Sequence, residues 1–359
     1  MRFPTISAFL LLSAIATLLT VSPKPAGATV GGELARYERN GWPPALATIE
    51  LPRGRSYVVV LQVPTVRPFD MSDVDGIRDT ILANMIDAPG WLGDKRLLGH
   101  SVVAWQCRSG RGVAAMTGES RGQGLMMAVA GGWGATPLLS VYLDGKVLRD
   151  GASFESYAKA MARGEGAIVA FEVTERDCQA MRAFLSRFIT HPDRPSRRYG
   201  LLLDPMRFEG GGCTSFALAL IAHSRIWRGG ERAAYRRIEL HDGVLGRRMS
   251  TPPGVLPYRT ARSPGDERIV PFGALYLRSW KSGAFIENVR IVDPELLFAM
   301  LVELRIAAGE TDGWRVKRRV SGKDPAVAAA IAEARRIVAR YPKRRFLAPD
   351  GYSVLVLER

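Results

Sequence analysis

Residues 210–221 read GGGCTSFALALI, three glycines that run into a cysteine and then into an apolar segment. The apolar run predicts a helix that begins near Cys213. A helix N-terminus carries partial positive charge and free N–H groups, and both favour a thiolate. Two interpretations of Cys213 stay open on this stretch alone: a nucleophile at a helix start, or a small side chain packed in a core helix.

The first 28 residues have the pattern of a secretory signal peptide. Arg2 precedes an apolar run, and Ala26-Gly27-Ala28 is a typical cleavage site. An uncleaved membrane anchor is the alternative. The next most apolar stretch, residues 295–308, is short and carries charges, so it predicts a buried or amphipathic helix. We therefore expect cleavage near Ala28 and a periplasmic or secreted protein with no transmembrane segment in the mature chain.

The composition is that of a folded, basic protein. The apolar share of 47% argues against global disorder, and the net charge is +15. Removal of the two basic residues of the leader leaves 48 basic and 35 acidic residues, about +13. For an exported chain this predicts contact with an anionic envelope surface rather than with nucleic acid, or simply a solvated basic surface. One candidate contact is the basic stretch 225–237, RIWRGGERAAYRR, unless Gly229 and Gly230 break its helix.

Three cysteines are present, so one of them stays unpaired within the chain. If Cys107 and Cys178 form a disulfide, the thiol of Cys213 remains free for chemistry. Sequence spacing alone does not show whether that pair forms.

The chain divides into a signal peptide (1–28), an N-terminal lead-in of strands and a helix (29–90), a central region (91–230) and a C-terminal α/β extension of unknown role (231–359). Residues 31–44 show no clear element, and the Asp-Gly turn within 138–148 predicts a hairpin. Further strands are predicted at 47–51, 56–63, 99–107, 112–120, 166–174 and 352–358. Helices are predicted at 70–87, 174–189, from Cys213 onward, at 295–308 and at 326–341.

A cysteine nucleophile needs a base, and His100 is the best placed of the four histidines. It stands at the head of the apolar strand GHSVVAW (99–105), where a strand end can present an imidazole to a helix start. The alternative is a histidine in an ordinary turn. His223 is nearly three turns along the helix of Cys213, too far to reach the thiol, and His191 and His241 lie in polar segments.

A third group would orient the base, and Glu119 is the candidate. It ends the strand that follows His100, so a hairpin between the two strands would bring both residues to the same end. A solvated loop glutamate is the alternative. Ser120, Asp204 and Gln106 are weaker candidates for this role.

The order of these motifs resembles the circularly permuted papain-like hydrolases, the NlpC/P60-related branch that includes lecithin:retinol acyltransferase-like proteins. GHSVVAW is similar to their histidine strand, and GGCTSFALALI (211–221) to their nucleophile helix. The resemblance covers about residues 95–225 and departs at Gly212, where relatives tend to carry Asn. It implies an α+β fold: an antiparallel sheet packed on the helix of Cys213, with N- and C-terminal extensions.

The resemblance and the residues together predict a secreted cysteine hydrolase. His100 would take the thiol proton and Cys213 would attack an acyl carbon to form a thioester, with Glu119 as the third catalytic residue. An amidase or peptidase that acts on envelope peptides such as peptidoglycan stems is the first expectation. A lipid-directed acyltransferase or lipase, and a non-catalytic envelope-binding module, are the alternatives. No metal or cofactor is predicted, because zinc, phosphate-loop and dinucleotide motifs are missing from the sequence.

Overall fold

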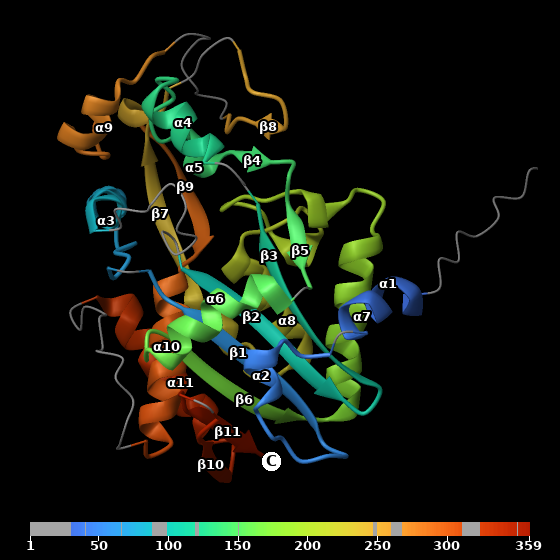
Figure 1. The fold of residues 1–359 in the computed structure, drawn as a ribbon. Helices are drawn as coiled ribbons and strands as arrows, with labels where there is room; N and C mark the ends of the chain where they lie inside the picture. Colours follow the sequence, from blue (N-terminus) through green and yellow to red (C-terminus); the bar gives the residue numbers. More distant parts are fainter. Residues whose placement is uncertain are drawn as a thin grey trace, which may run out of the picture.

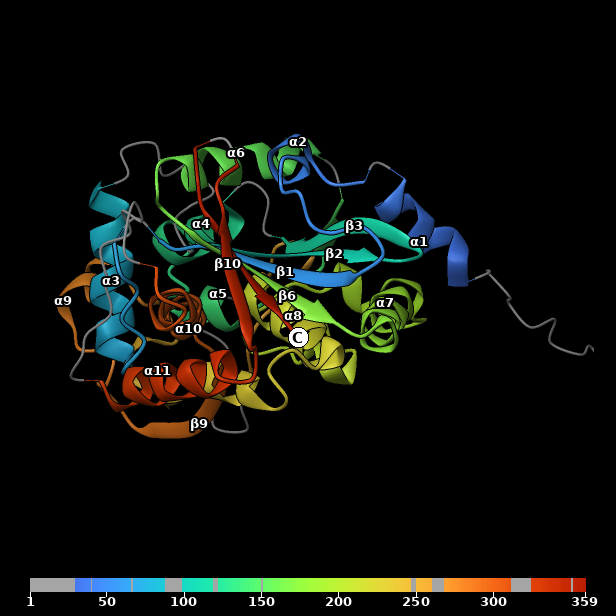
Figure 2. The same ribbon diagram turned by 90° about the horizontal axis from the view of Figure 1, so that it is seen from below.

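The computed structural model describes residues 30–39, 41–65, 67–87, 99–118, 122–149, 151–246, 250–259, 268–310, 324–349 and 351–359. The fold is mixed α+β, with helices on both faces of a seven-stranded sheet (Figures 1 and 2). Within the described ranges, no helix is both long enough and apolar enough to cross a bilayer.

The main sheet is mostly antiparallel. Its strand order is β10-β11-β6-β1-β2-β3-β5, and β11 alone runs parallel to its neighbour β6. The strands are β1 (Ser56–Val63), β2 (His100–Cys107), β3 (Gly110–Thr117), β5 (Lys146–Leu148), β6 (Ala167–Val173), β10 (Lys343–Leu347) and β11 (Val354–Glu358). Two smaller antiparallel pairs join β4 (Val141–Tyr142) to β8 (Val255–Leu256) and β7 (Tyr235–His241) to β9 (Phe285–Val292).

Two helical layers cover the main sheet. One face packs on α1 (Val30–Glu38), α7 (Glu175–Thr190), α8 (Cys213–Ser224), α10 (Pro294–Ala307) and α11 (Pro325–Val338). The other face packs on α2 (Pro44–Ala47) and α6 (Gly151–Ala162), which lie together on the opposite side of the sheet in Figure 2. The remaining helices are α3 (Val74–Asp87), α4 (Gln123–Val129), α5 (Thr136–Leu139) and α9 (Phe272–Leu277), with 3₁₀ turns at Pro195–Arg197, Pro205–Arg207, Gly230–Ala234 and Asp242–Val244.

Strand β1 shows why its sequence is a continuous apolar run. Val58 and Val60 enter the core beneath α7, α8 and α10, whereas Val59 and Leu61 enter the core beneath α2 and α6. Alternate side chains of a strand point to opposite faces, so a strand covered on both faces is apolar at most positions rather than at alternate ones.

Local capping signals placed several helices correctly. The Thr174 side chain accepts a hydrogen bond from the Asp177 N–H at the start of α7. Asp293 and Asp324 cap α10 and α11 in the same way, each followed by proline in the first turn. The hairpin between β2 and β3 is also confirmed.

The lead-in differs from the expectation. Residues 31–44, predicted to lack a clear element, contain most of α1 and the start of α2, and 47–51 is not a strand. Helix α1 is held by tertiary contacts: its Glu38 pairs with Arg182 of α7 at 2.6 Å and accepts a hydrogen bond from Trp105 at 2.9 Å. Such contacts between distant segments leave no local pattern in the sequence.

The hairpin predicted around Asp144-Gly145 was wrong. Strand β4 pairs with β8, and β5 pairs with β3 at the edge of the main sheet. The turn is present, but longer-range partners take the strands on either side of it.

The C-terminal third is joined to the same core. The buried Arg305 of α10 donates to the carbonyl oxygens of Ile168 at 2.8 Å and Ser353 at 2.9 Å, and it pairs with Glu310. These contacts tie α10 to β6 and to the segment before β11. The main sheet therefore draws strands from the lead-in, the central region and the C-terminal extension alike.

Candidate active site

Cys213 is the first residue of α8 and follows a glycine loop. Gly210 has a φ of +123°, and a Cβ there would lie 2.4 Å from the Arg198 carbonyl oxygen, so the turn needs glycine. Gly212 is in extended conformation at the N-cap position. The chain therefore turns sharply before the helix and presents Cys213, a free and partly exposed cysteine, in the first turn.

His100 begins β2 beside this helix start. The preceding Gly99 has a φ of +66°, and a Cβ there would meet the Val63 carbonyl oxygen at 2.7 Å. The backbone at the head of the strand thus requires glycine at position 99. The imidazole is 6% exposed and stacks on the Tyr157 ring of α6, with centroids 4.7 Å apart and planes inclined by 7°. This stack fixes the plane of the ring.

The sheet opens where His100 lies. The ladder between β2 and β3 ends at the pair Val103–Ala114, and β3 then pairs with β5. Ser101, two residues closer to the head of β2, lies beyond this last pair, and its N–H helps to lower the pKa of the Cys213 thiol.

The surroundings favour the thiolate form of Cys213. Burial alone would raise the pKa of this thiol, but the charge and hydrogen bond of His100, with smaller contributions from Thr214 and the Ser101 N–H, lower it to about 7. The ordinary cysteine pKa is about 8.5, so the protein stabilises the anion despite the cost of desolvation. Together with a position at a helix N-terminus, these contacts describe an activated thiol.

A buried polar chain connects the sheet to the helix start. Gln62 of β1 accepts a hydrogen bond from Ser101, and the Ser101 and Thr214 hydroxyls are 2.9 Å apart. Thr214 Oγ1 in turn lies 3.7 Å from the Cys213 sulfur. Because Gln62 and Ser101 are fully buried, this chain fixes how the first turn of α8 sits against the sheet.

Two tyrosines adjoin the thiol and were not predicted from the sequence. Burial and the charge of Cys213 raise the pKa of Tyr157. Burial, the charge of Cys213 and a hydrogen bond to it raise the pKa of Tyr199. Both phenols therefore stay protonated at neutral pH, and the Tyr199 hydroxyl hydrogen-bonds the Cys213 side chain.

Tyr199 is held in place by its backbone. It exchanges two 2.8 Å hydrogen bonds with Tyr142 and forms a bridge with Gly211, just before the nucleophile. Gly118 lies so close to Tyr199 that a Cβ there would approach the tyrosine Cβ to 2.4 Å. The only sequence hint of these contacts was the small residue at 118.

No family model, curated protein or solved structure matches this chain. The assignment of roles to the site therefore depends on its own geometry.

The third catalytic residue stays a prediction. Glu119 and Ser120 lie outside the described residues. The β2–β3 ladder ends at Val103–Ala114, before it reaches His100, so the pairing of the two strands does not place Glu119 beside the imidazole.

The other third-residue candidates and histidines make contacts elsewhere. Gln106 is at the opposite end of β2 and binds Arg111, and Asp204 caps a 3₁₀ turn. His191 and His223 stack on phenylalanine rings, and His241 lies at the end of β7.

Cys107 and Cys178 form a disulfide, which leaves Cys213 as the free thiol. Within the described ranges, no group of three or more His, Cys, Asp or Glu side chains is arranged to hold a metal ion.

The basic stretch 225–237 does not form one helical face. Helix α8 ends at Ser224, and Arg225 and Arg228 have positive φ. Arg236 is instead paired with Asp293 at 2.8 Å and Asp324 at 2.7 Å, so it ties β7 to the starts of α10 and α11.

The Gly212→Asn variant should fold, with a free energy of unfolding equal to or up to about 1 kcal/mol above that of the parent. The backbone there has φ −88°, and a Cβ would meet nothing closer than 3.7 Å. Denaturant unfolding of both proteins measures the change. A loss above about 1 kcal/mol would show that the cap position does not accept a side chain.

Proposed function

We propose that this protein is an exported cysteine hydrolase on a permuted papain-like arrangement, with Cys213 as nucleophile and His100 as general base. The lowered pKa of the Cys213 thiol beside His100 carries the proposal. The chain order, in which the histidine strand precedes the cysteine helix, and an antiparallel sheet packed on that helix also support it.

The mechanism follows from the placement of these groups. His100 accepts the thiol proton, and the thiolate attacks the acyl carbon of an amide. The tetrahedral oxyanion collapses, the C–N bond breaks, and His100 returns the proton to the leaving amine. Water then attacks the thioester, with His100 again as base, and releases a carboxylic acid and the free thiol.

The oxyanion needs donors beside the sulfur, and the first turn of α8 offers the Cys213 N–H, which faces the Tyr199 hydroxyl oxygen until a substrate binds. The Gly212 N–H is already used, because it donates to Ser215 Oγ at 2.9 Å. The Tyr199 hydroxyl, which hydrogen-bonds the Cys213 side chain, supplies a second donor once the sulfur has bonded to the acyl carbon.

The Tyr199→Phe variant tests that donor. We expect turnover to fall about 100-fold, because one oxyanion donor is lost. Alkylation of Cys213 should still titrate near pH 7, since His100 makes the largest contribution to lowering the thiol pKa. Turnover equal to the parent would remove Tyr199 from oxyanion stabilisation. Tyr142→Phe is the matched control, because the Tyr142 hydroxyl donates to the Pro137 carbonyl at 2.9 Å.

An envelope peptide, such as a peptidoglycan stem, is the substrate class we propose. The signal-peptide pattern and the Cys107–Cys178 disulfide are both consistent with an oxidising, extracytoplasmic location. A net charge of about +13 without the leader favours approach to an anionic envelope.

The function is tested by incubation with purified sacculi and, separately, with phospholipid vesicles, followed by mass spectrometry of the products. Release of peptides by the parent and none by Cys213→Ala is the expected result. Fatty-acid release from vesicles alone would replace the peptidase by a lipase with the same thiol chemistry. Products from both the parent and Cys213→Ala would exclude Cys213 from the reaction.

A further inference from the structure

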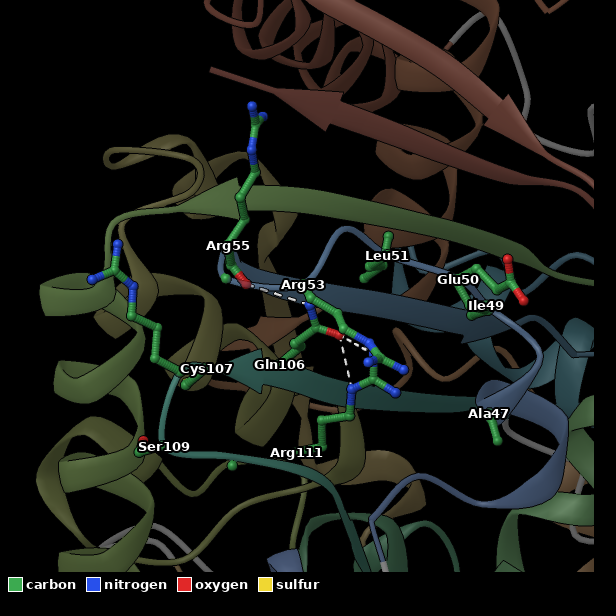
Figure 3. Close-up of a pocket in the computed structure, with 13 residues that line it drawn as sticks. Ala47, Ile49, Glu50, Leu51, Arg53, Arg55, Gln106, Cys107, Ser109 and Arg111 are labelled. Atoms are coloured by element: carbon green, nitrogen blue, oxygen red, sulfur yellow. Dashed lines mark hydrogen bonds between the residues drawn. The ribbon is translucent and has the colours of Figure 1, made fainter.

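A second candidate site lies at the other end of β2. An open surface cavity of about 730 Å³ is lined by residues 47–55 on one side and 106–111 on the other (Figure 3). Gln106 in its wall is six residues along the strand from His100, roughly 20 Å at the usual rise. The cavity is therefore separate from the thiol of Cys213, and the proposed hydrolysis does not use it.

The charged lining of this cavity is strongly basic. It contains Arg53, Arg55, Arg108 and Arg111 against one acid, Glu50. Arg55 pairs with Glu172 at 3.3 Å and points away from the cavity in Figure 3, and Arg108 lies near Glu175. Among the described residues, Arg53 and Arg111 have no carboxylate partner.

Arg111 is held in a fixed position. Its Nε donates to Gln106 Oε1 at 2.8 Å, and its guanidinium lies 4.8 Å from the centroid of the Trp42 ring. Gln106 is itself 6% exposed and donates to the carbonyl oxygens of Pro52 at 2.9 Å and Arg55 at 3.3 Å. A guanidinium fixed in this way loses little conformational entropy when it binds a ligand.

Arg53 reaches over the same cavity toward Arg111 (Figure 3). Burial and the neighbouring Arg53 charge both lower the pKa of Arg111, as expected when two cations are close and no anion separates them. This repulsion is relieved when an anion binds between the two guanidinium groups. An unneutralised pair in a cavity thus favours an anionic ligand.

We propose that this cavity binds a phosphate group between Arg53 and Arg111. A carboxylate has two oxygens and is satisfied by the fork of one arginine, whereas a phosphate offers enough oxygens for two forks. The cavity is larger than a phosphate alone needs, so an organic group attached to the phosphate also fits. The phosphate belongs to a small phosphorylated molecule or to a phospholipid headgroup, which share this chemistry.

Calorimetric titration of the full protein with inorganic phosphate, glycerol 3-phosphate and acetate tests the proposal. We expect one phosphate site, binding that weakens at least about tenfold in Arg53→Gln, and weaker binding of acetate. Co-sedimentation with phosphatidylglycerol vesicles that is reversed by inorganic phosphate would show that the bound phosphate group belongs to a lipid headgroup. Phosphate binding without vesicle binding would identify a soluble ligand.

Arg207→Gln removes the same charge and is the control, because Arg207 is exposed and its ion-pair partner among the described residues is Glu209. An equal loss of binding in this control, or unchanged binding in Arg53→Gln, would overturn the site. Acetate binding as tight as phosphate would also overturn it. The rate of Cys213 alkylation, measured against pH, should be the same in the parent and in Arg53→Gln. Failure of the phosphate site would therefore not count against the proposed hydrolase.

Discussion

In the His100→Ala variant, alkylation of Cys213 at pH 7 should slow about 15-fold. The thiolate fraction rises as pH passes through the thiol pKa, so a pKa of about 7 makes half the thiol reactive at pH 7. Without the imidazole the pKa returns to about 8.5 or above, and roughly 3% remains ionised. Iodoacetamide reaction rates measured against pH locate both midpoints.

Hydrolysis by the same variant should fall further than alkylation, by about 1000-fold, because His100 also serves as the acid that protonates the leaving group. His223→Ala is the matched control, since His223 stacks on Phe184 well along the same helix. An alkylation midpoint that stays near pH 7 without His100 would contradict the proposed pair.

Loss of the Cys107–Cys178 disulfide should lower the free energy of unfolding by about 4 kcal/mol. The bridge spans 71 residues of sequence and links the end of β2 to α7, so its removal frees a long loop in the unfolded chain. Denaturant unfolding of the Cys107→Ala/Cys178→Ala variant and of the bridged protein gives this value. Both proteins also carry Cys213→Ala, because the third thiol could otherwise exchange with the disulfide.

A change under about 1 kcal/mol would mean that the bridge does not form or does not constrain the unfolded state. With Cys213 restored, alkylation of the bridge-free protein should still titrate near pH 7. The β1–β2 ladder from Tyr57–Gln106 to Val63–His100 keeps His100 in place without the bridge.

Features of the fold that depend on neighbouring residues could be predicted from the sequence. The apolar run of β1, the Thr174 cap of α7, and the Asp-Pro starts of α10 and α11 are local patterns, and the structure has each of them. Helix α1 and the pairing of β5 with β3 depend on partners far along the chain. No local pattern specifies such partners, and both were missed.

The candidate site divides in the same way. Cys213 and His100 could be predicted because a glycine loop before a helix and a Gly-His at a strand head are local patterns. Tyr199 could not, because it reaches the thiol through bridges to Tyr142 and Gly211. The arginine cavity combines residues 53 and 111, which only the folded sheet brings together. The role of Glu119 stays a prediction.

The first two residues of β2 point to opposite faces of the sheet, and both lie near the thiol. This restricts the insertions and deletions that the strand can accept without loss of function. His100 lies on the α6 side, against Tyr157, and Ser101 lies on the α8 side, against Thr214. A one-residue insertion or deletion between Gly99 and Cys107 would exchange the two sides or break the register with β1. We expect a library of length variants to accept changes in the 108–109 turn and none within residues 100–106.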